Sequence, residues 1–138
     1  MAGYSGTPLA KKLGIVAGSA LLVCDAPPNY RELLEPWPAD VAMLVNISAK
    51  VDVIHMFVTS RLVLESRLKK YRTAMRENAT VWVSWPKKSS KVATDITEDT
   101  IRDVALAMGM VDIKVCAVDA VWSGLKLVIR RENRKLRG

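Results

Sequence analysis

Runs of apolar residues alternate with amphipathic stretches along the 138-residue chain. Strands are predicted from Ser19 to Cys24 and in "VDVIHMFV". Both "VDVIHMFV" and "VAMLVNI" are apolar on each face, which is typical of parallel strands that are covered by helices. Four further strands are predicted in "VAMLVNI" (Val41 to Ile47), "ATVWVSW", "VDIKVCAVD" and "LKLVIRR".

Helical spacing separates several of these strands. From Ser60 onward apolar residues recur three or four positions apart beside a charged face, which predicts a long helix. A second helix is predicted in "TEDTIRDVALAMG", with Thr97 as its cap and Gly109 just past its end. Shorter helices are predicted in "TPLAKKLG" and from Asn29 to Leu34.

This order of elements predicts a three-layer, Rossmann-like α/β fold with a mostly parallel sheet that ends in an antiparallel β-hairpin. The link between the second and third strands is too short for a helical crossover. The second strand is therefore either a short edge strand with an extended return or a strand that is not parallel. Residues 1–131 are expected to form a single domain, and residues 132–138 a basic C-terminal tail.

The composition indicates the general class of protein and shows where the positive charge lies along the chain. Half of the residues are apolar and a quarter charged, which is the profile of an ordinary soluble domain. The net charge is +7, but the final segment "RRENRKLRG" holds five basic residues and one acidic residue, so the rest of the chain is nearly balanced. Such a tail is most often a solvated segment, and less often an arm for nucleic acid.

The cysteines and the apolar run near the start of the chain indicate the cellular compartment of the protein. Cys24 and Cys116 lie in apolar strands, as is usual for thiols in a reducing compartment. "LGIVAGSALLVC" imitates a signal sequence, but Asp25 opens a turn that continues into a helix, and the run is too short to span a membrane. We therefore expect a cytoplasmic protein that has no membrane partner. One histidine and two distant cysteines predict no metal site.

The terminal hairpin carries a resemblance. A parallel sheet finished in this way resembles the class I S-adenosylmethionine-dependent methyltransferases, here shortened by about one βα unit. Within that group, "GYSGTPLAKKLGI", "DVIHMFVTSR", "WVSWPKK" and "VCAVDAVWSGLKLV" resemble a family of small bacterial proteins, domain of unknown function 3052. The resemblance covers nearly the whole chain. It implies a methyltransferase-like fold but no activity.

Candidate ligand-binding residues follow from this fold, because ligands of open α/β sheets bind beyond the carboxyl ends of the parallel strands. Those ends are predicted at "DAPPNY", "TSR" and "SWPKK", with Asp119 and the turn "WSGLK" beside them. Ser60, Arg61, Ser84 and Lys87 are expected to meet an anion together, with a tryptophan on the pocket wall. The full candidate set is Asp25, Thr59, Ser60, Arg61, Ser84, Trp85, Lys87, Lys88, Asp119, Trp122 and Lys126.

The turn "DAPPNY" argues against a conventional cofactor. Nucleotide-binding turns use glycine for close approach and for positive φ, whereas this turn has two prolines, which remove two amide donors. The second strand ends near Asn46 and offers no acidic residue for a ribose. The sequence thus predicts no cofactor, and S-adenosylmethionine in particular is not expected to bind.

The remaining side chains leave the reaction open. His55 lies within an apolar strand and is interpreted as a hydrogen-bonded core residue, with no serine or cysteine placed to form a triad with it. We expect a non-catalytic methyltransferase-like domain that binds an anionic small molecule or a protein partner at the strand ends. The alternatives are a nucleic-acid-associated protein that uses the basic tail and "KKSSK", or a transferase with a rebuilt cofactor site.

Overall fold

The fold was determined from a computed structural model, which describes residues 7–134. Its six strands are β1 (Ala20–Cys24), β2 (Ala42–Leu44), β3 (Val53–Phe57), β4 (Thr80–Pro86), β5 (Met110–Ala117) and β6 (Trp122–Ile129). Its α-helices are α1 (Leu9–Lys12), α2 (Tyr30–Leu33), α3 (Arg61–Ala74) and α4 (Glu98–Ala107), and short 3₁₀ helices lie at Lys88–Ser90 and Arg131–Asn133.

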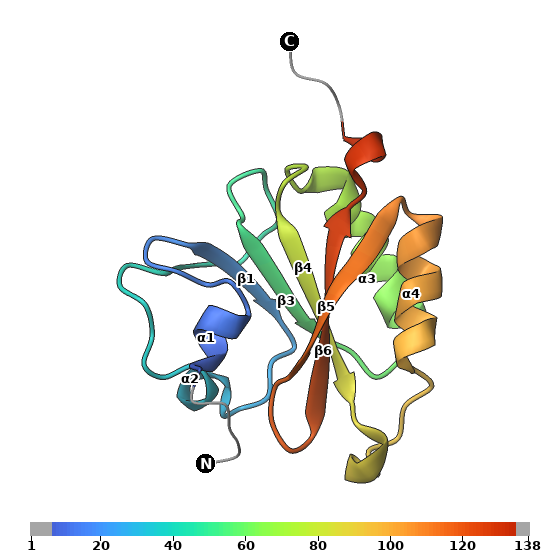
Figure 1. Ribbon diagram of the computed structural model, residues 1–138, viewed down its shortest axis with the longest axis horizontal. Helices are drawn as coiled ribbons and strands as arrows, with labels where there is room; N and C mark the ends of the chain where they lie inside the picture. Colours follow the sequence, from blue (N-terminus) through green and yellow to red (C-terminus); the bar gives the residue numbers. More distant parts are fainter. Residues whose placement is uncertain (1–6, 135–138) are drawn as a thin grey trace.

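All six strands form a single sheet in the order β2-β1-β3-β4-β6-β5 (Figure 1). β1 pairs in parallel with β2 and β3, and β3 pairs in parallel with β4. β6 runs antiparallel to both β4 and β5, between which it lies. The predicted α/β fold class is thereby confirmed, including the antiparallel hairpin at the end of the chain.

Of the two alternatives for the second strand, the structure shows the short edge strand. β2 covers three residues rather than the seven of Val41 to Ile47, and it pairs in parallel with β1. The chain then returns to β3 through an extended segment, in which the amide of Val51 donates to the carbonyl of Ser48. The Asp52 amide donates to the Ala20 carbonyl, so the return reaches β3 beside the start of β1.

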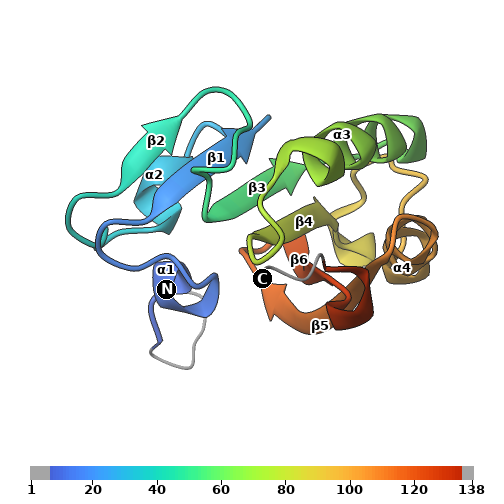
Figure 2. The ribbon, with the colours of Figure 1, turned by 90° about the horizontal axis from the view of Figure 1, so that it is seen from above.

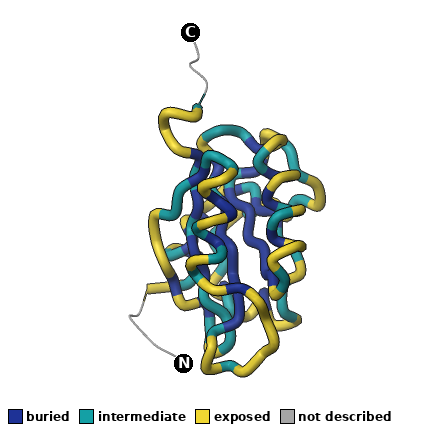
Figure 3. Tube along the Cα trace, turned by 90° about the vertical axis from the view of Figure 1, so that its right-hand side faces the viewer, coloured by how far each residue is buried: buried dark blue, intermediate teal, exposed yellow. Residues whose placement is uncertain are grey.

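The sheet separates two apolar cores, with helices on both faces (Figure 2). On one face α3 and α4 pack through buried side chains such as Leu64, Leu68 and Ile101. On the other face α1 and α2 pack around Trp82, Phe57 and their neighbours. The inner strands therefore form the buried centre of the domain (Figure 3). The edge strands β2 and β5 are largely exposed, so the prediction that the second strand is covered on both faces is wrong, because an edge strand at this position has no helix over it.

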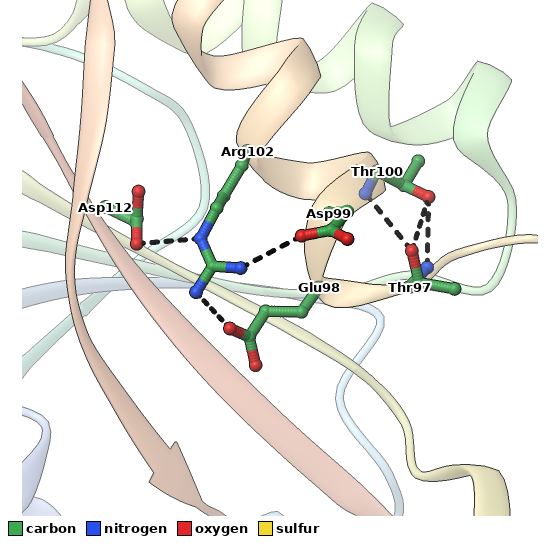
Figure 4. A network of polar contacts seen from close by, with 6 residues as sticks. All are labelled: Thr97, Glu98, Asp99, Thr100, Arg102 and Asp112. Atoms are coloured by element: carbon green, nitrogen blue, oxygen red, sulfur yellow. Dashed lines mark hydrogen bonds and ion pairs between the residues drawn. The ribbon is translucent and has the colours of Figure 1, made fainter.

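Helix ends follow the predicted caps. The Ser60 hydroxyl accepts from the Val63 amide at the start of α3, and Thr97 forms a reciprocal capping box with Thr100 at the start of α4. Beside that box, Arg102 pairs with Glu98, Asp99 and Asp112 (Figure 4). The hydrogen bonds that Arg102 donates to Asp112 and Glu98 raise the pKa of Arg102 further. This network ties α4 to β5.

The start of the basic tail contacts the domain. The Arg130 amide and the Asn133 side-chain amide both donate to the carbonyl of Gly109, which has a left-handed φ of +74°. The Arg134 guanidinium donates to the Ile129 carbonyl. Residues 132–134 of the predicted tail thus follow the last strand closely, whereas residues 135–138 lie outside the described residues.

Candidate functional site

A pocket of about 260 Å³ opens at the carboxyl ends of β1 and β3. Four of its lining residues come from the predicted candidates, namely Asp25, Thr59, Ser60 and Trp122. The others are Phe57, Val58, Val63 and Arg67. The structure therefore brings the ends of the first and third strands together with the hairpin tryptophan, at the edge of the sheet where open α/β folds bind ligands.

The turn after β1 contains a residue with a left-handed backbone conformation, which the sequence-based prediction expected only from glycine. Asp25 has a φ of +54°, in the left-handed region, which aspartate tolerates better than most residues. The two prolines follow, and the amide of Tyr30 donates to the carbonyl of Pro27 as α2 begins. Absence of glycine from "DAPPNY" thus did not prevent a tight left-handed turn at the pocket.

Arg67 is the pocket residue that sequence reasoning missed. One guanidinium nitrogen, Nη2, forms an ion pair with the Asp25 carboxylate, and the side chains of Arg67 and Asp25 are 30% and 62% exposed. The other nitrogen, Nη1, is buried and has no hydrogen-bond partner among the described residues. A buried donor without a partner is costly, so this atom marks a place where a ligand oxygen would be stabilised.

The sequence did contain a signal for Arg67. It follows Leu64 by three residues and precedes Tyr71 by four, so it lies beside the buried stripe of α3 rather than on the solvated side. A long basic side chain at such a position keeps its stem on apolar surface and carries its charge to the helix margin. That margin faces the end of β1.

A thiol and a phenol lie beneath the ion pair. Cys24 Sγ and Tyr71 Oη are 2.7 Å apart. Burial raises the pKa of the Cys24 thiol, and burial together with the hydrogen bond from Cys24 raises the pKa of Tyr71 to about 12. Both groups are therefore protonated at neutral pH and add no charge near the ion pair.

The N-terminus of α3 already holds a carboxylate from this chain. The Arg61 amide donates to Asp95 Oδ1 at 2.8 Å, and the Thr59 carbonyl accepts from the Thr94 hydroxyl at 2.7 Å. Arg61 itself extends along the exposed side of the helix toward Glu65. The first amide of α3 is therefore not free for the anion that Ser60 and Arg61 were expected to meet, because Asp95 accepts from it.

The hairpin turn presents Trp122 to the pocket. Asp119 Oδ1 accepts from the amides of Val121 and Trp122, both at 2.8 Å, so the carboxylate is used in shaping the turn. The Trp122 ring meets Phe57 edge to face, with ring centroids 5.0 Å apart. Trp122 thus forms an apolar wall, and Asp119 positions it.

Ser84 and Trp85 lie elsewhere, contrary to the predicted cluster. β4 continues to Pro86, so both residues are inside the strand rather than in the loop after it. Ser84 is fully buried, and its hydroxyl lies 2.7 Å from His55 Nε2. Trp85 is buried in the core under α3 and α4. The predicted meeting of Ser84 with Arg61 and Lys87 around one anion is therefore wrong.

His55 has the core role that was expected, with an unexpected partner. Its Nδ1 lies 2.9 Å from the Tyr30 hydroxyl and its Nε2 faces Ser84, so a serine does contact it. Complete burial lowers the pKa of His55 to about 3 and raises the pKa of Tyr30 well above its usual range. The three groups form a neutral hydrogen-bonded chain that is closed to solvent.

The lysine candidates are dispersed. The Lys87 amide donates to the Val121 carbonyl at 2.7 Å, which keeps this residue near the hairpin turn, and Lys88 is exposed in the 3₁₀ helix that follows. Lys126 lies within β6 and lines a different cavity with Thr80 and Asp52, at the amino ends of the parallel strands. Lys126 is therefore separated from the other candidates, because the antiparallel β6 carries it toward the opposite edge of the sheet.

Comparison with known proteins places the fold. No family model matches the chain, and no curated protein matches its sequence. Among solved structures it is similar to an S-adenosylmethionine-dependent methyltransferase from Aquifex aeolicus, with 14% identity and a TM-score of 0.55 over 88% of each chain. The chain has a methyltransferase-like fold.

Two further neighbours were solved with ligands. Magnesium protoporphyrin IX methyltransferase from Synechocystis, with bound S-adenosylmethionine, shares 8% identity at a TM-score of 0.56, over 88% of this chain and 74% of that one. LepI, in complex with S-adenosylhomocysteine and a substrate analogue, shares 12% identity at a TM-score of 0.54, over 88% of this chain and 39% of that one.

These neighbours correct the cofactor prediction. The sequence predicted no cofactor and excluded S-adenosylmethionine, yet solved structures of the same fold include complexes with that molecule and its demethylated product. The prediction failed because it treated glycine as the only residue for a left-handed turn, whereas Asp25 adopts that conformation here. Across residues 7–134, no three histidine, cysteine or acidic side chains gather into a metal site, and no helix is both long and apolar enough to cross a membrane.

Proposed function

We propose that the pocket at the carboxyl ends of β1 and β3 binds S-adenosylmethionine or a closely related adenosyl amino acid. The observation that carries the proposal is Arg67, which lines this pocket and whose buried Nη1 has no hydrogen-bond partner among the described residues. The ligand-bound neighbours of the same fold support the choice of ligand class.

The side chains present fit the chemistry of such a ligand. A free donor of Arg67 would meet the carboxylate of the amino acid, since guanidinium groups bind carboxylates by charge-assisted hydrogen bonds. The Asp25 carboxylate would meet its ammonium group or a ribose hydroxyl. Trp122 and Phe57 provide an apolar wall for the flat base. The bound ligand would supply an electrophilic methyl group on its sulfonium.

The size of the pocket limits how much of the ligand it encloses. Small-molecule pockets commonly measure about 300 to 1,000 Å³, so a cavity of about 260 Å³ holds only part of an adenosyl amino acid. The remainder would lie along the open edge of the sheet. The proposal therefore concerns binding, and we keep the expectation of a non-catalytic domain as part of it.

We also propose that the chain is a member of the small bacterial family that its motifs resemble. The four motifs quoted above support membership of domain of unknown function 3052, and their residues within 7–134 lie in and around α1, β3, β4 and the β5–β6 hairpin. A small ligand at the strand ends is also compatible with the expected anionic ligand, because the amino-acid end of S-adenosylmethionine carries a carboxylate. A protein partner at this edge would compete with that ligand.

Titration calorimetry with S-adenosylmethionine tests the proposal. Wild-type protein is expected to bind the ligand saturably, and Arg67→Met is expected to weaken binding by on the order of tenfold or more, because a hydrogen bond to a charged group contributes about 1.5–3 kcal/mol. Lys69→Met removes the same charge from an exposed position on α3 and is expected to leave the affinity unchanged. Absence of binding at millimolar ligand, or equal losses in both variants, would overturn the proposal.

A further inference from the structure

The β5–β6 hairpin carries two lysines directly opposite each other. The strand register pairs Lys114 of β5 with Lys126 of β6, and Lys126 in turn with Trp82 of β4. Directly paired residues of antiparallel strands point to the same face. Since Trp82 belongs to the core under α1, both lysines lie on the α1 face of the sheet, and α4 packs on the opposite face.

This pair is electrostatically unfavourable in the protein alone. Like charges directly opposite on neighbouring strands destabilise a sheet. Neither lysine has an ion-pair partner among residues 7–134. The acid nearest to Lys114 along β5 is Asp112, which the bulge between them turns to the other face, where it pairs with Arg102 (Figure 4). Asp52 shares a cavity with Lys126, but it pairs with Arg76.

A third lysine reaches the same place from α1. The thiol of Cys116, two residues after Lys114, is affected by the positive charges of both Lys12 and Lys114. These charges oppose burial, which is the larger influence and raises the pKa of that thiol. Because α1, which contains Lys12, packs in the same core as Cys116 of β5, we group Lys12 with Lys114 and Lys126 as the lysine face.

We propose that the lysine face binds the phosphate backbone of a nucleic acid. Phosphates between the lysines would turn a repulsive arrangement into an attractive one. The face is open, with Lys114 exposed on an edge strand, which suits an extended polyanion better than an enclosed small anion. No aromatic side chain is among the exposed large hydrophobic residues of the described chain, so we expect contacts to phosphates rather than stacking on bases.

The lysine face is independent of the strand-end pocket. Lys126 lies toward the amino ends of the parallel strands, whereas the pocket lies at their carboxyl ends. In Figure 1, β4 ends at the lower edge of the sheet and β6 ends at the upper edge. The lysine face also differs from the basic tail and from "KKSSK", which were the basis of the nucleic-acid alternative in the sequence analysis. Loss of one site is therefore expected to leave the other intact.

Fluorescence anisotropy with a labelled single-stranded 20-nucleotide RNA tests this inference. Wild-type protein is expected to bind with an affinity that falls steeply as salt rises. The Lys114→Ala, Lys126→Ala double variant is expected to bind more weakly, with a salt slope reduced by about 1.4 because each phosphate contact to a single strand contributes about 0.7. Removing the lysines also removes their repulsion, so the variant is expected to melt at or above the wild-type temperature.

The matched control removes two exposed lysines from α3, which covers the other face of the sheet. Lys69→Ala, Lys70→Ala carries the same change of net charge and is expected to retain the wild-type affinity and slope. Equal weakening in both double variants would mean that only net charge matters, and absence of RNA binding at 50 mM salt would also overturn the inference. Displacement of the RNA by equimolar pyrophosphate would show a small-phosphate site instead.

Discussion

Replacing Trp82 with alanine is expected to lower the free energy of unfolding by about 3–5 kcal/mol. The indole is fully buried in the core between the sheet and α1, and its Nε1 donates to the Leu13 carbonyl at 2.9 Å. Alanine would leave a cavity and would deprive that carbonyl of its donor. A loss of this size is large for a domain whose total stability is on the order of 5–15 kcal/mol.

The packing around the ring explains why neighbours would not fill the cavity. Gly124 of β6 lies directly beside Trp82, and a Cβ built on that glycine would be 3.2 Å from the ring. Gly124 therefore has no side chain that could move into the cavity, and Lys126, which pairs with Trp82 across the strands, carries a charge. Urea unfolding followed by circular dichroism measures the change, and Trp82→Phe, which keeps an aromatic ring but loses the N–H, is expected to cost less than the alanine variant. A loss below about 1 kcal/mol in Trp82→Ala would contradict this account of the core.

The second large effect is a loss of stability in mild acid that depends on His55. The folded protein keeps this histidine neutral down to a pKa of about 3, whereas the usual value is 6.5. Between these values the unfolded chain binds a proton that the folded chain does not. The contribution of the neutral His55 to the free energy of unfolding is therefore fully present above about pH 6.5. It is lost as the pH drops toward 3, by about 1.4 kcal/mol per pH unit.

Comparison with His55→Gln isolates this contribution. Glutamine can still hydrogen-bond to Tyr30 and Ser84, but it does not titrate. Between pH 6.5 and pH 5, the wild type is expected to lose about 2 kcal/mol more of its unfolding free energy than the variant does. Urea unfolding at the two pH values measures the difference. Equal losses in the two proteins would show that His55 becomes charged in the folded state.

The fold was predictable because its signals are local and repeated. The continuous apolar run of β3 marked a covered strand, and helical spacing, with Thr97 as a cap, located α3 and α4. The end of β4 was harder to predict from the sequence, because the pairing with β6 determines where the strand ends. β6 pairs with β4 as far as Pro86, which turns Ser84 into an inward strand residue.

The candidate site was predictable only in part, since its members depend on tertiary geometry. Thr59, Ser60 and Trp122 followed from the rule that loops after parallel strands meet at one edge. Arg67 could not be chosen from its helix alone, because its role depends on where the turn after β1 places Asp25. The left-handed backbone of Asp25 in turn replaced the glycine on which the cofactor prediction relied.

The most direct test of the central claim is a map of ligand contacts on the folded protein. Backbone amide spectra recorded during titration with S-adenosylmethionine should show saturable shifts centred on Asp25, Thr59, Ser60 and Trp122, which line the strand-end pocket. Lys126 and Thr80, at the opposite edge of the sheet, should serve as internal controls and remain unshifted. Shifts centred on those two residues, or no shifts at millimolar ligand, would contradict the claim that this pocket binds an adenosyl amino acid.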